Sequence, residues 1–481
     1  MTKKKNGAGV ASKKKWLIMV YLAGDNPLNE DMATAISDIN ENYQMLQNYK
    51  FAVYFDNGTP LFNTKQYYFD TPLGDPPKDL GEGDAADPKS VEEFVEWSVT
   101  ESKSYDPDYY ALIMAGHGDG FQSYSFMRDE NPLGAMPITA TSPGTGPHNS
   151  LREVLEKQLL PGGKKLDILA FDTCVMATFE VAYELRKTAN IMVASQGYVP
   201  ITGWSYLELI KRFERNEANN KLSPTSTAKA MMKAYMTYSR RYAKLVGRST
   251  DISAIQLGMV EQLKDSINRL AALLNVFPDP PPPKGKPKRE VASVRQFRAI
   301  LEKTILLSHL RSQTFLFEQC VDIVDFCKSL ASECDYFRRF LTNASERKLF
   351  KDIKDECDKI ENLVRAFTID PCFKGPEYQF GNGVSLFCPW SFTSYKLTKQ
   401  KYDSFEFAAK SGVTGDDRLP EPWSKFLENF LSHSERGPVN STARGVQRVD
   451  PTSGRPRGDF SSQIEKFGGI KNFSLAWNDI P

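Results

Sequence analysis

The first half of the chain alternates between apolar runs and segments whose apolar residues recur at helical spacing. Residues 16–23 form an almost unbroken apolar run, which is typical of a parallel strand that helices cover on both faces. In residues 29–46, by contrast, the apolar side chains fall on one side of a helix. The same two patterns predict further strands at 51–55, 109–115, 166–171 and 190–194, and helices at 88–102, 179–185 and 207–213.

This alternation predicts an α/β fold. Parallel strands need a long crossover connection between them, and an intervening helix supplies it. We therefore expect a doubly wound, mostly parallel sheet with helices on both faces, built from residues 16–277.

Changes in composition divide the rest of the chain. Residues 1–15 carry two groups of three lysines and predict a disordered basic leader, whereas 278–290 contain four consecutive prolines and predict an extended spacer. Residues 291–432 form a helix-rich region, in which we expect a strand at 384–388 to return to the core. The polar residues 433–481 predict a largely disordered tail. Helices within the helix-rich region are expected at 291–307, 318–330 and 345–367.

The charge balance disfavours two classes of partner. The chain has 61 basic and 60 acidic residues and a net charge of +1, so no overall field favours a nucleic acid or a membrane. Residues 16–23 are too short to span a membrane and lack a small-residue cleavage site. We therefore expect no nucleic-acid partner, no membrane partner and a cytoplasmic location.

The seven cysteines do not predict a disulfide framework, because their number is odd and they are spread over a long chain. Cys320, Cys327 and Cys334 recur at every seventh position of a helical stretch. A metal site would need shorter spacings and neighbouring histidines, so we interpret these three as buried apolar side chains. Whether a metal binds elsewhere stays open.

Two predicted strands end in residues that can carry chemistry. The strand at 109–115 leads into Gly-His-Gly-Asp-Gly, which contains His117, and the strand at 166–171 leads into Asp-Thr-Cys, which contains Cys174. Taken alone, such a cysteine is usually just buried, and any tight turn can use a Gly-His-Gly sequence. Ligands of doubly wound sheets bind beyond the carboxyl ends of the strands, however, so the two side chains together are candidates for one site.

A cysteine beside a histidine predicts nucleophilic catalysis. The thiolate is the reactive form of cysteine, and an imidazole takes up the thiol proton or delivers a proton to a leaving amine. The glycines around His117 leave room for a substrate backbone and free the Gly118 amide to face a developing oxyanion. The backbone amide of Cys174, expected at the start of the following helix, is the natural second donor. This chemistry requires no cofactor.

Three segments resemble the clostripain family of cysteine peptidases, which belongs to the caspase-like clan: 16–25 (WLIMVYLAGD), 115–120 (AGHGDG) and 167–176 (DILAFDTCVM). Residues 195–204, 321–326 and 382–390 are also similar to that family, so the resemblance covers most of residues 14–392. It implies a caspase-like fold, a dyad of His117 and Cys174, and cleavage of proteins or peptides after Arg or Lys. Relatives are often activated by self-cleavage, and some depend on Ca²⁺.

Asp172 is the candidate for that specificity, since it lies two positions before Cys174 and a carboxylate holds Arg or Lys by charge-assisted hydrogen bonds. Metacaspases, which also prefer basic residues, resemble the chain at this offset. The alternative is that Asp172 caps the following helix. Relatives often carry a second acidic residue in a Trp-Asp-Tyr-like segment, where this chain has Ser205 between Trp204 and Tyr206. If Ser205 fills that position, the pocket holds one carboxylate rather than two.

Other readings remain open. The chain could be a non-enzymatic scaffold with a caspase-like fold, or a protease with non-basic specificity, and its helix-rich region could bind a regulatory partner. Residues 121–149 form a long polar loop between the two candidate catalytic residues, of the kind that is often functional. Self-cleavage by an enzyme specific for basic residues is expected after Arg128 or Arg152, and an uncut surface loop is the alternative.

Overall fold

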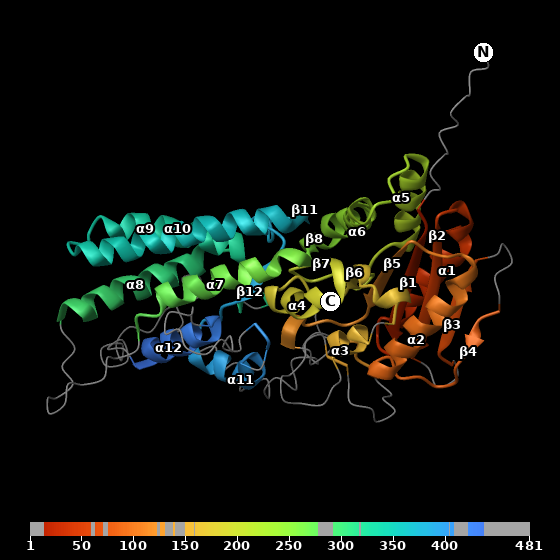
Figure 1. Cartoon of the computed structure of the whole chain (residues 1–481), viewed down its shortest axis with the longest axis horizontal. Helices are drawn as coiled ribbons and strands as arrows, with labels where there is room; N and C mark the ends of the chain where they lie inside the picture. The colour runs from red at the N-terminus through yellow and green to blue at the C-terminus, as the bar shows by residue number, and fades with distance from the viewer. Residues whose placement is uncertain are drawn as a thin grey trace, which may run out of the picture.

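The computed structural model describes most of the chain, and nine strands form its central sheet (Figure 1). The strand order is β11-β8-β7-β6-β5-β1-β2-β3-β4. The strands are β1 (Trp16–Gly24), β2 (Tyr49–Asn57), β3 (Lys65–Phe69), β4 (Lys78–Asp79), β5 (Tyr109–Ala115), β6 (Leu166–Asp172), β7 (Ala189–Ala194), β8 (Thr250–Gln256) and β11 (Thr368–Lys374). The described residues are 14–58, 63–70, 76–122, 126–129, 138–139, 150–157, 159–277, 292–316, 319–403, 405–407 and 422–436.

The middle of the sheet is parallel and its edges are antiparallel. Strand β1 pairs in parallel with β2 and β5, and the parallel pairing continues from β5 through β6 to β7. On both sides of this group the added strands run antiparallel: β3 and β4 at one edge, β8 and β11 at the other. The predicted doubly wound α/β sheet is confirmed for the five central strands, and the antiparallel edges make the whole sheet mixed.

Alternating side chains of the central strands fill two separate cores. Along β1, Leu17, Met19 and Tyr21 enter one apolar cluster, whereas Ile18 and Val20 enter the other. All are fully buried, as the unbroken apolar run predicted. The second cluster is covered by α1 (Asn29–Asn42), α5 (Tyr206–Ala218) and α6 (Pro224–Val246), and the first by α2 (Pro88–Glu101), α3 (Leu151–Glu156), α4 (Phe179–Glu184) and α7 (Val260–Leu274).

The helix-rich second half extends from the β8/β11 edge of the sheet. Figure 1 shows α7, α8, α9 and α10 running side by side away from the strands, and α9 contacts α8 and α10, while α10 also contacts α7. The helices of this half are α8 (Ala292–Arg311), α9 (Ile323–Arg338), α10 (Ala344–Phe367), α11 (Phe392–Tyr402) and α12 (Trp423–Arg436). Their apolar residues join the first cluster, so both halves share one core.

One predicted boundary in this region is wrong. The helix expected at 318–330 begins only at Ile323, because Cys320–Asp322 form strand β10 of a small antiparallel sheet with β9 (Thr314–Phe315) and β12 (Ser385–Phe387). Strand β12, expected within 384–388, therefore pairs outside the main sheet, although its residues Leu386 and Phe387 lie in the first core cluster. Cys320, Cys327 and Cys334 are all buried, as predicted.

Several predicted segments lie largely or wholly outside the described residues. They are most of the leader 1–15, the spacer 278–290, most of the loop 121–149 and most of the tail 433–481.

The docking of α12 leads to a prediction. Trp423 is fully buried, and its indole Nε1 donates a hydrogen bond to the Phe387 carbonyl over 2.8 Å. Trp423→Ala leaves a cavity and an unpaired carbonyl, so the free energy of unfolding should fall by about 3–5 kcal/mol. Urea unfolding followed by circular dichroism measures this change. Lys425→Ala, at an exposed position of the same helix, should alter it by less than about 0.5 kcal/mol. Equal effects of the two substitutions would contradict the docking.

Candidate active site

The candidate site begins where β5 and β6 end. These parallel neighbours pair Ala115 with Asp172, and the Gly116 amide donates to the Asp172 carbonyl over 3.3 Å. His117 and Cys174 each lie two residues beyond the paired positions. Both loops therefore leave the sheet at the same level of its carboxyl edge, where doubly wound sheets bind their ligands.

The loop after β5 packs directly on the turn after β6. A Cβ atom at Gly118 would lie 2.8 Å from the Cys174 carbonyl oxygen and from the Thr173 side chain. At Gly120, whose φ is +65°, a Cβ atom would lie 2.8 Å from the Val175 carbonyl oxygen. Only glycine permits so close an approach. These glycines thus serve the contact between the two loops, and the passage of a substrate backbone beside them stays a prediction.

Cys174 lies in a turn and not, as expected, at the start of a helix. Helix α4 begins five residues later at Phe179, and the side chain of Thr178 caps it by accepting from the Val181 amide. Val175, next to the nucleophile candidate, has a φ of +62°, which is strained for a β-branched residue. Among the described residues, no hydrogen bond is donated by the amide of Gly118 or of Cys174, the two expected oxyanion donors.

The backbone that follows β7 contacts the sulfur of Cys174. The Val199 amide donates to Sγ over 3.3 Å, and Sγ lies 3.7 Å from the Val199 carbonyl oxygen. Asp251 of β8 accepts hydrogen bonds from the amides of Gln196 and Gly197 over 2.7 and 2.9 Å, which holds this segment in place. Sequence analysis missed Val199 because its contribution comes from the backbone, which leaves no side-chain signal in a motif.

Burial keeps both members of the pair uncharged at neutral pH. It raises the pKa of the Cys174 thiol to about 12; the Val199 amide opposes this rise and the Asp172 carboxylate adds to it. Burial also lowers the pKa of His117 to about 4, and the positive charge of Arg128 lowers it further. At neutral pH the thiol and the imidazole are therefore both uncharged, and the neutral imidazole is the form that accepts a proton.

Asp172 is buried at the end of β6 with half of its carboxylate unused. Its Oδ2 accepts from the Trp204 amide over 2.9 Å, whereas its Oδ1 has no hydrogen-bond partner among the described residues. Burial raises the pKa of this carboxyl to about 7. Asp172 does not cap the following helix, since Thr178 does. The positive φ of +58° at Gly203 brings that backbone against the carboxylate, where a Cβ atom would lie 2.9 Å from Oδ2.

Two further polar residues bear on the Asp172 carboxylate as candidates for the same pocket, Ser205 and Asp31. The Ser205 hydroxyl caps α5 by accepting from the Glu208 amide over 3.3 Å, so it already has a structural partner. Asp31 of α1, which sequence analysis did not single out, lies close enough for its charge to raise the pKa of Asp172. Nothing in the local sequence pairs Asp31 with Asp172, because α1 and β6 meet only in the folded chain.

The two candidate cleavage positions differ in their surroundings. Arg128 belongs to the described part of the long loop, its carbonyl accepts from the Asn26 side chain over 3.0 Å, and its charge acts on His117. Arg152 lies in helix α3, where its guanidinium donates to Glu184 over 2.9 Å and to Glu406 over 3.2 Å. An extended substrate strand would require α3 to unfold around Arg152.

Comparisons with known proteins identify the family. The model of the clostripain family matches residues 20–330, which is more than half of the 481 residues. The chain belongs to the clostripain family. Clostripain from Hathewaya histolytica is 28% identical over 144 residues, which are 29% of this chain and 26% of that enzyme. The chain thus matches about a quarter of the length of this curated relative.

Solved structures of similar fold come from the same group of peptidases. An inactive zymogen C11 protease from Parabacteroides distasonis has a TM-score of 0.52 at 15% identity, with 83% of this chain and 98% of that chain covered. The secreted C11 cysteine protease "iotapain" from Bacteroides thetaiotaomicron also has a TM-score of 0.52, at 12% identity, with 82% and 99% covered. At such identities the likeness concerns the fold, and it confirms the predicted caspase-like sheet.

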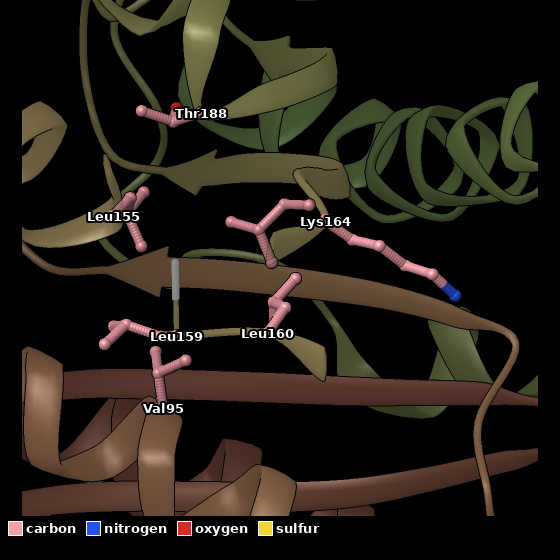
Figure 2. Close-up of a pocket in the computed structure, with 7 residues that line it drawn as sticks. Val95, Leu155, Leu159, Leu160, Lys164 and Thr188 are labelled. Carbon is pink, nitrogen blue, oxygen red and sulfur yellow. The ribbon is translucent and has the colours of Figure 1, made fainter. Parts of the chain in front are cut away.

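The hollow drawn in Figure 2 does not belong to the clostripain-like site. Leu166 in its wall is the first residue of β6, and its amide donates to the carbonyl of Thr188, just before β7. The hollow therefore lies at the amino edge of the sheet, opposite the edge that bears His117 and Cys174. Its apolar walls mark it as a gap in packing. Its lining consists of Val95, Leu155, Leu159, Leu160, Lys164, Leu166 and Thr188.

A search for metal ligands and membrane spans over the described residues gives no candidate. In that part of the chain, no group of three or more His, Cys, Asp or Glu side chains is arranged to hold a metal ion. None of the helices described is long and apolar enough to cross a membrane.

The neutral resting pair leads to a prediction for this clostripain relative. With a thiol pKa of about 12, the thiolate fraction should rise roughly tenfold per pH unit below that value. Alkylation of Cys174 by iodoacetamide should therefore accelerate steadily between about pH 5 and 9. Mass spectrometry of the Cys174 peptide measures the rate, and Cys174→Ser gives the background from the other cysteines. A flat rate across this range would indicate a thiolate–imidazolium pair instead.

Proposed function

We propose that the chain is a cysteine endopeptidase in which Cys174 is the nucleophile and His117 the general base. The packing of the glycine-rich loop on the Cys174 turn carries this proposal, because it places the two residues over the same strand ends. The Val199 amide holds the sulfur, and the imidazole is in the neutral form that a general base needs. Family membership supports peptide hydrolysis as the reaction, and the surroundings of Cys174 and His117 support their assignment as nucleophile and general base.

The reaction proposed has two stages. His117 takes the thiol proton as the Cys174 sulfur attacks the carbonyl carbon of the scissile peptide, and the carbonyl oxygen becomes an oxyanion. The amides of Gly118 and Cys174, which donate no hydrogen bond within the described part of the chain, stabilise that oxyanion. His117 then gives the proton to the leaving amine, and the C–N bond breaks to leave a thioester. A water molecule, deprotonated by His117, hydrolyses the thioester and returns Cys174 as a thiol.

Substitution of either residue tests the dyad. Cys174→Ala should abolish turnover of a fluorogenic peptide, and His117→Ala should reduce kcat by about 10²–10⁴-fold, because the general base is lost. Circular dichroism should show both variants folded. Turnover by folded Cys174→Ala at the wild-type rate would overturn the assignment, whereas a folded wild type without turnover would favour the scaffold reading.

A comparison of the wild type with Cys174→Ala tests self-cleavage. We propose Arg128 rather than Arg152 as the cleavage position, because Arg152 is held in a helix by two carboxylates. Intact-mass spectrometry should find a fragment that ends at Arg128 in the wild type and not in Cys174→Ala. An active wild type that remains one intact chain would show that cleavage is not required.

We further propose that Asp172 selects Arg or Lys on the amino side of the cleaved bond. Its free Oδ1 offers a charge-assisted hydrogen bond to a cationic side chain, and the nearby Asp31 adds negative charge. Binding a cation there would also relieve the cost of burying the carboxylate, which the raised pKa of Asp172 expresses. Ser205 remains a weaker candidate for this pocket, since it caps α5. The alternative of non-basic specificity is decided by the following experiment.

A peptide panel with Arg, Lys, Asp and Leu at the cleaved position measures the preference. Asp172→Asn should lower kcat/KM for the Arg peptide by roughly 10- to 100-fold, the loss expected for one charge-assisted hydrogen bond. It should leave the Leu peptide nearly unchanged. Asp31→Asn should have a smaller effect in the same direction, and Ser205→Ala should weaken the helix cap without altering the preference. Unchanged cleavage of the Arg peptide by Asp172→Asn would remove Asp172 from the pocket.

For the partners and the location of the protein, we propose only general classes. Family membership supports protein or peptide substrates, and binding of a regulatory partner by the helix-rich region stays a proposal. Dependence on Ca²⁺ is testable by chelation with EGTA and re-addition of the ion. We keep the cytoplasmic location as a proposal, although "iotapain" is described as secreted. Fractionation of cells that express the native gene would decide between the two compartments.

A further inference from the structure

The end of helix α11 lies against two segments that we call the catalytic segments: residues 116–122, which contain His117, and residues 174–180, which contain Cys174. In the sequence it is more than 200 residues distant from either segment. Its contacts begin with Phe121, which follows the His117 loop and is almost fully buried. The Phe121 ring meets Phe387, Tyr402 and Phe405 edge to face, with ring centres 5.0, 5.6 and 5.9 Å apart. Aromatic pairs of this geometry stabilise a contact beyond the area they bury.

A lysine on α11 holds the same loop by a polar contact. The Lys401 ammonium donates to the carbonyl oxygen of Gln122, and the charge of Asp119, two residues after His117, acts on it. Burial lowers the pKa of Lys401 to about 8, so this cation is held where water screens it little. Strand β5 ends at Ala115, so the residues that follow it need support from outside the sheet.

Tyr402, the next residue, reaches the other catalytic segment. Its hydroxyl donates over 2.9 Å to Oε1 of Glu180, which also accepts from the Phe387 amide over 2.9 Å. Glu180 is fully buried in α4, the helix that follows the Cys174 turn. Strand β12 is fastened to the same segment, since the Ser385 amide donates to the Ala177 carbonyl over 3.0 Å. Strand β12 and α4 are in contact, and Figure 1 draws them close to each other.

We propose that Lys401 and Tyr402 are positioning residues that press the His117 loop onto the Cys174 turn. Lys401 holds the histidine side through the Gln122 carbonyl, and Tyr402 bridges both sides through Phe121 and Glu180. The helix-rich half is then a working part of the catalytic centre, separate from any role in binding partners. The effect on turnover rests on the proposed dyad, whereas the effect on the loop itself does not.

Two substitutions and two matched controls test this role. Lys401→Met removes the ammonium, and Tyr402→Phe removes the hydroxyl but keeps the ring in the aromatic cluster. The controls lie on the same helix: Lys399→Met, whose ammonium pairs with Asp403 and Glu428, and Tyr395→Phe, whose hydroxyl donates to the Ser424 carbonyl over 3.0 Å. The ion pairs of Lys399 and the hydroxyl hydrogen bond of Tyr395 therefore involve no residue of a catalytic segment.

Hydrogen exchange gives a readout that does not depend on activity. Amides of residues 116–122 should exchange faster in Lys401→Met, and those of 174–180 faster in Tyr402→Phe, while both controls keep wild-type rates in these segments. Unchanged exchange in both test variants would overturn the positioning role. Faster exchange spread evenly over the whole chain would overturn it as well, since that pattern means general destabilisation.

Kinetics gives the second readout. A misplaced general base lowers kcat, so Lys401→Met should lose about 10-fold or more in kcat with KM nearly unchanged, and Lys401→Arg, which keeps a cationic donor, should recover most of it. A loss of kcat equal to that of the control at equal thermal stability would contradict the proposal. If the Cys174→Ala variant kept the wild-type turnover rate, the proposed dyad would be wrong. The hydrogen-exchange rates would still decide whether Lys401 and Tyr402 hold the loop.

Discussion

The structure depends on one close contact, between the glycine-rich loop after β5 and the turn after β6. At Gly118 and Gly120 the two backbones approach so closely that no side chain fits between them. Parallel pairing of β5 and β6 brings the loops to the same edge, and the absence of Cβ atoms then lets them touch. His117 and Cys174 owe their common place to this contact. The sheet alone would leave their loops free to separate.

The helix-rich half is part of the same construction. Its residues complete the apolar cluster on one face of the sheet. Strand β12 and helix α11 reach the segments that follow His117 and Cys174 through hydrogen bonds and aromatic contacts. Glu180 is central here, because one buried carboxylate oxygen joins α4 to both β12 and α11. Buried polar groups of this kind are costly unless they are hydrogen-bonded, so they favour one arrangement of the chain over others.

Burial also sets the charge state of the site. It raises the pKa of Cys174 to about 12 and lowers the pKa of His117 to about 4, so both side chains are uncharged at neutral pH. Burial likewise raises the pKa of the Asp172 carboxyl, to about 7. Burying a charged group is costly, so the neutral forms of these side chains are favoured at these positions.

The sequence by itself determined the central strands, the helices between them and the two strand ends that bear His117 and Cys174. It could do so because apolar runs and helical periodicity are local properties, and because glycines beside a histidine are visible in a motif. Tertiary structure alone decided the antiparallel edges, the strand at Cys320–Asp322, the backbone contact of Val199 with the sulfur and the approach of Asp31 to Asp172. Each of these joins segments far apart in the chain through backbone groups or charges. Such contacts leave no periodicity at either segment, so they exist only once the chain has folded.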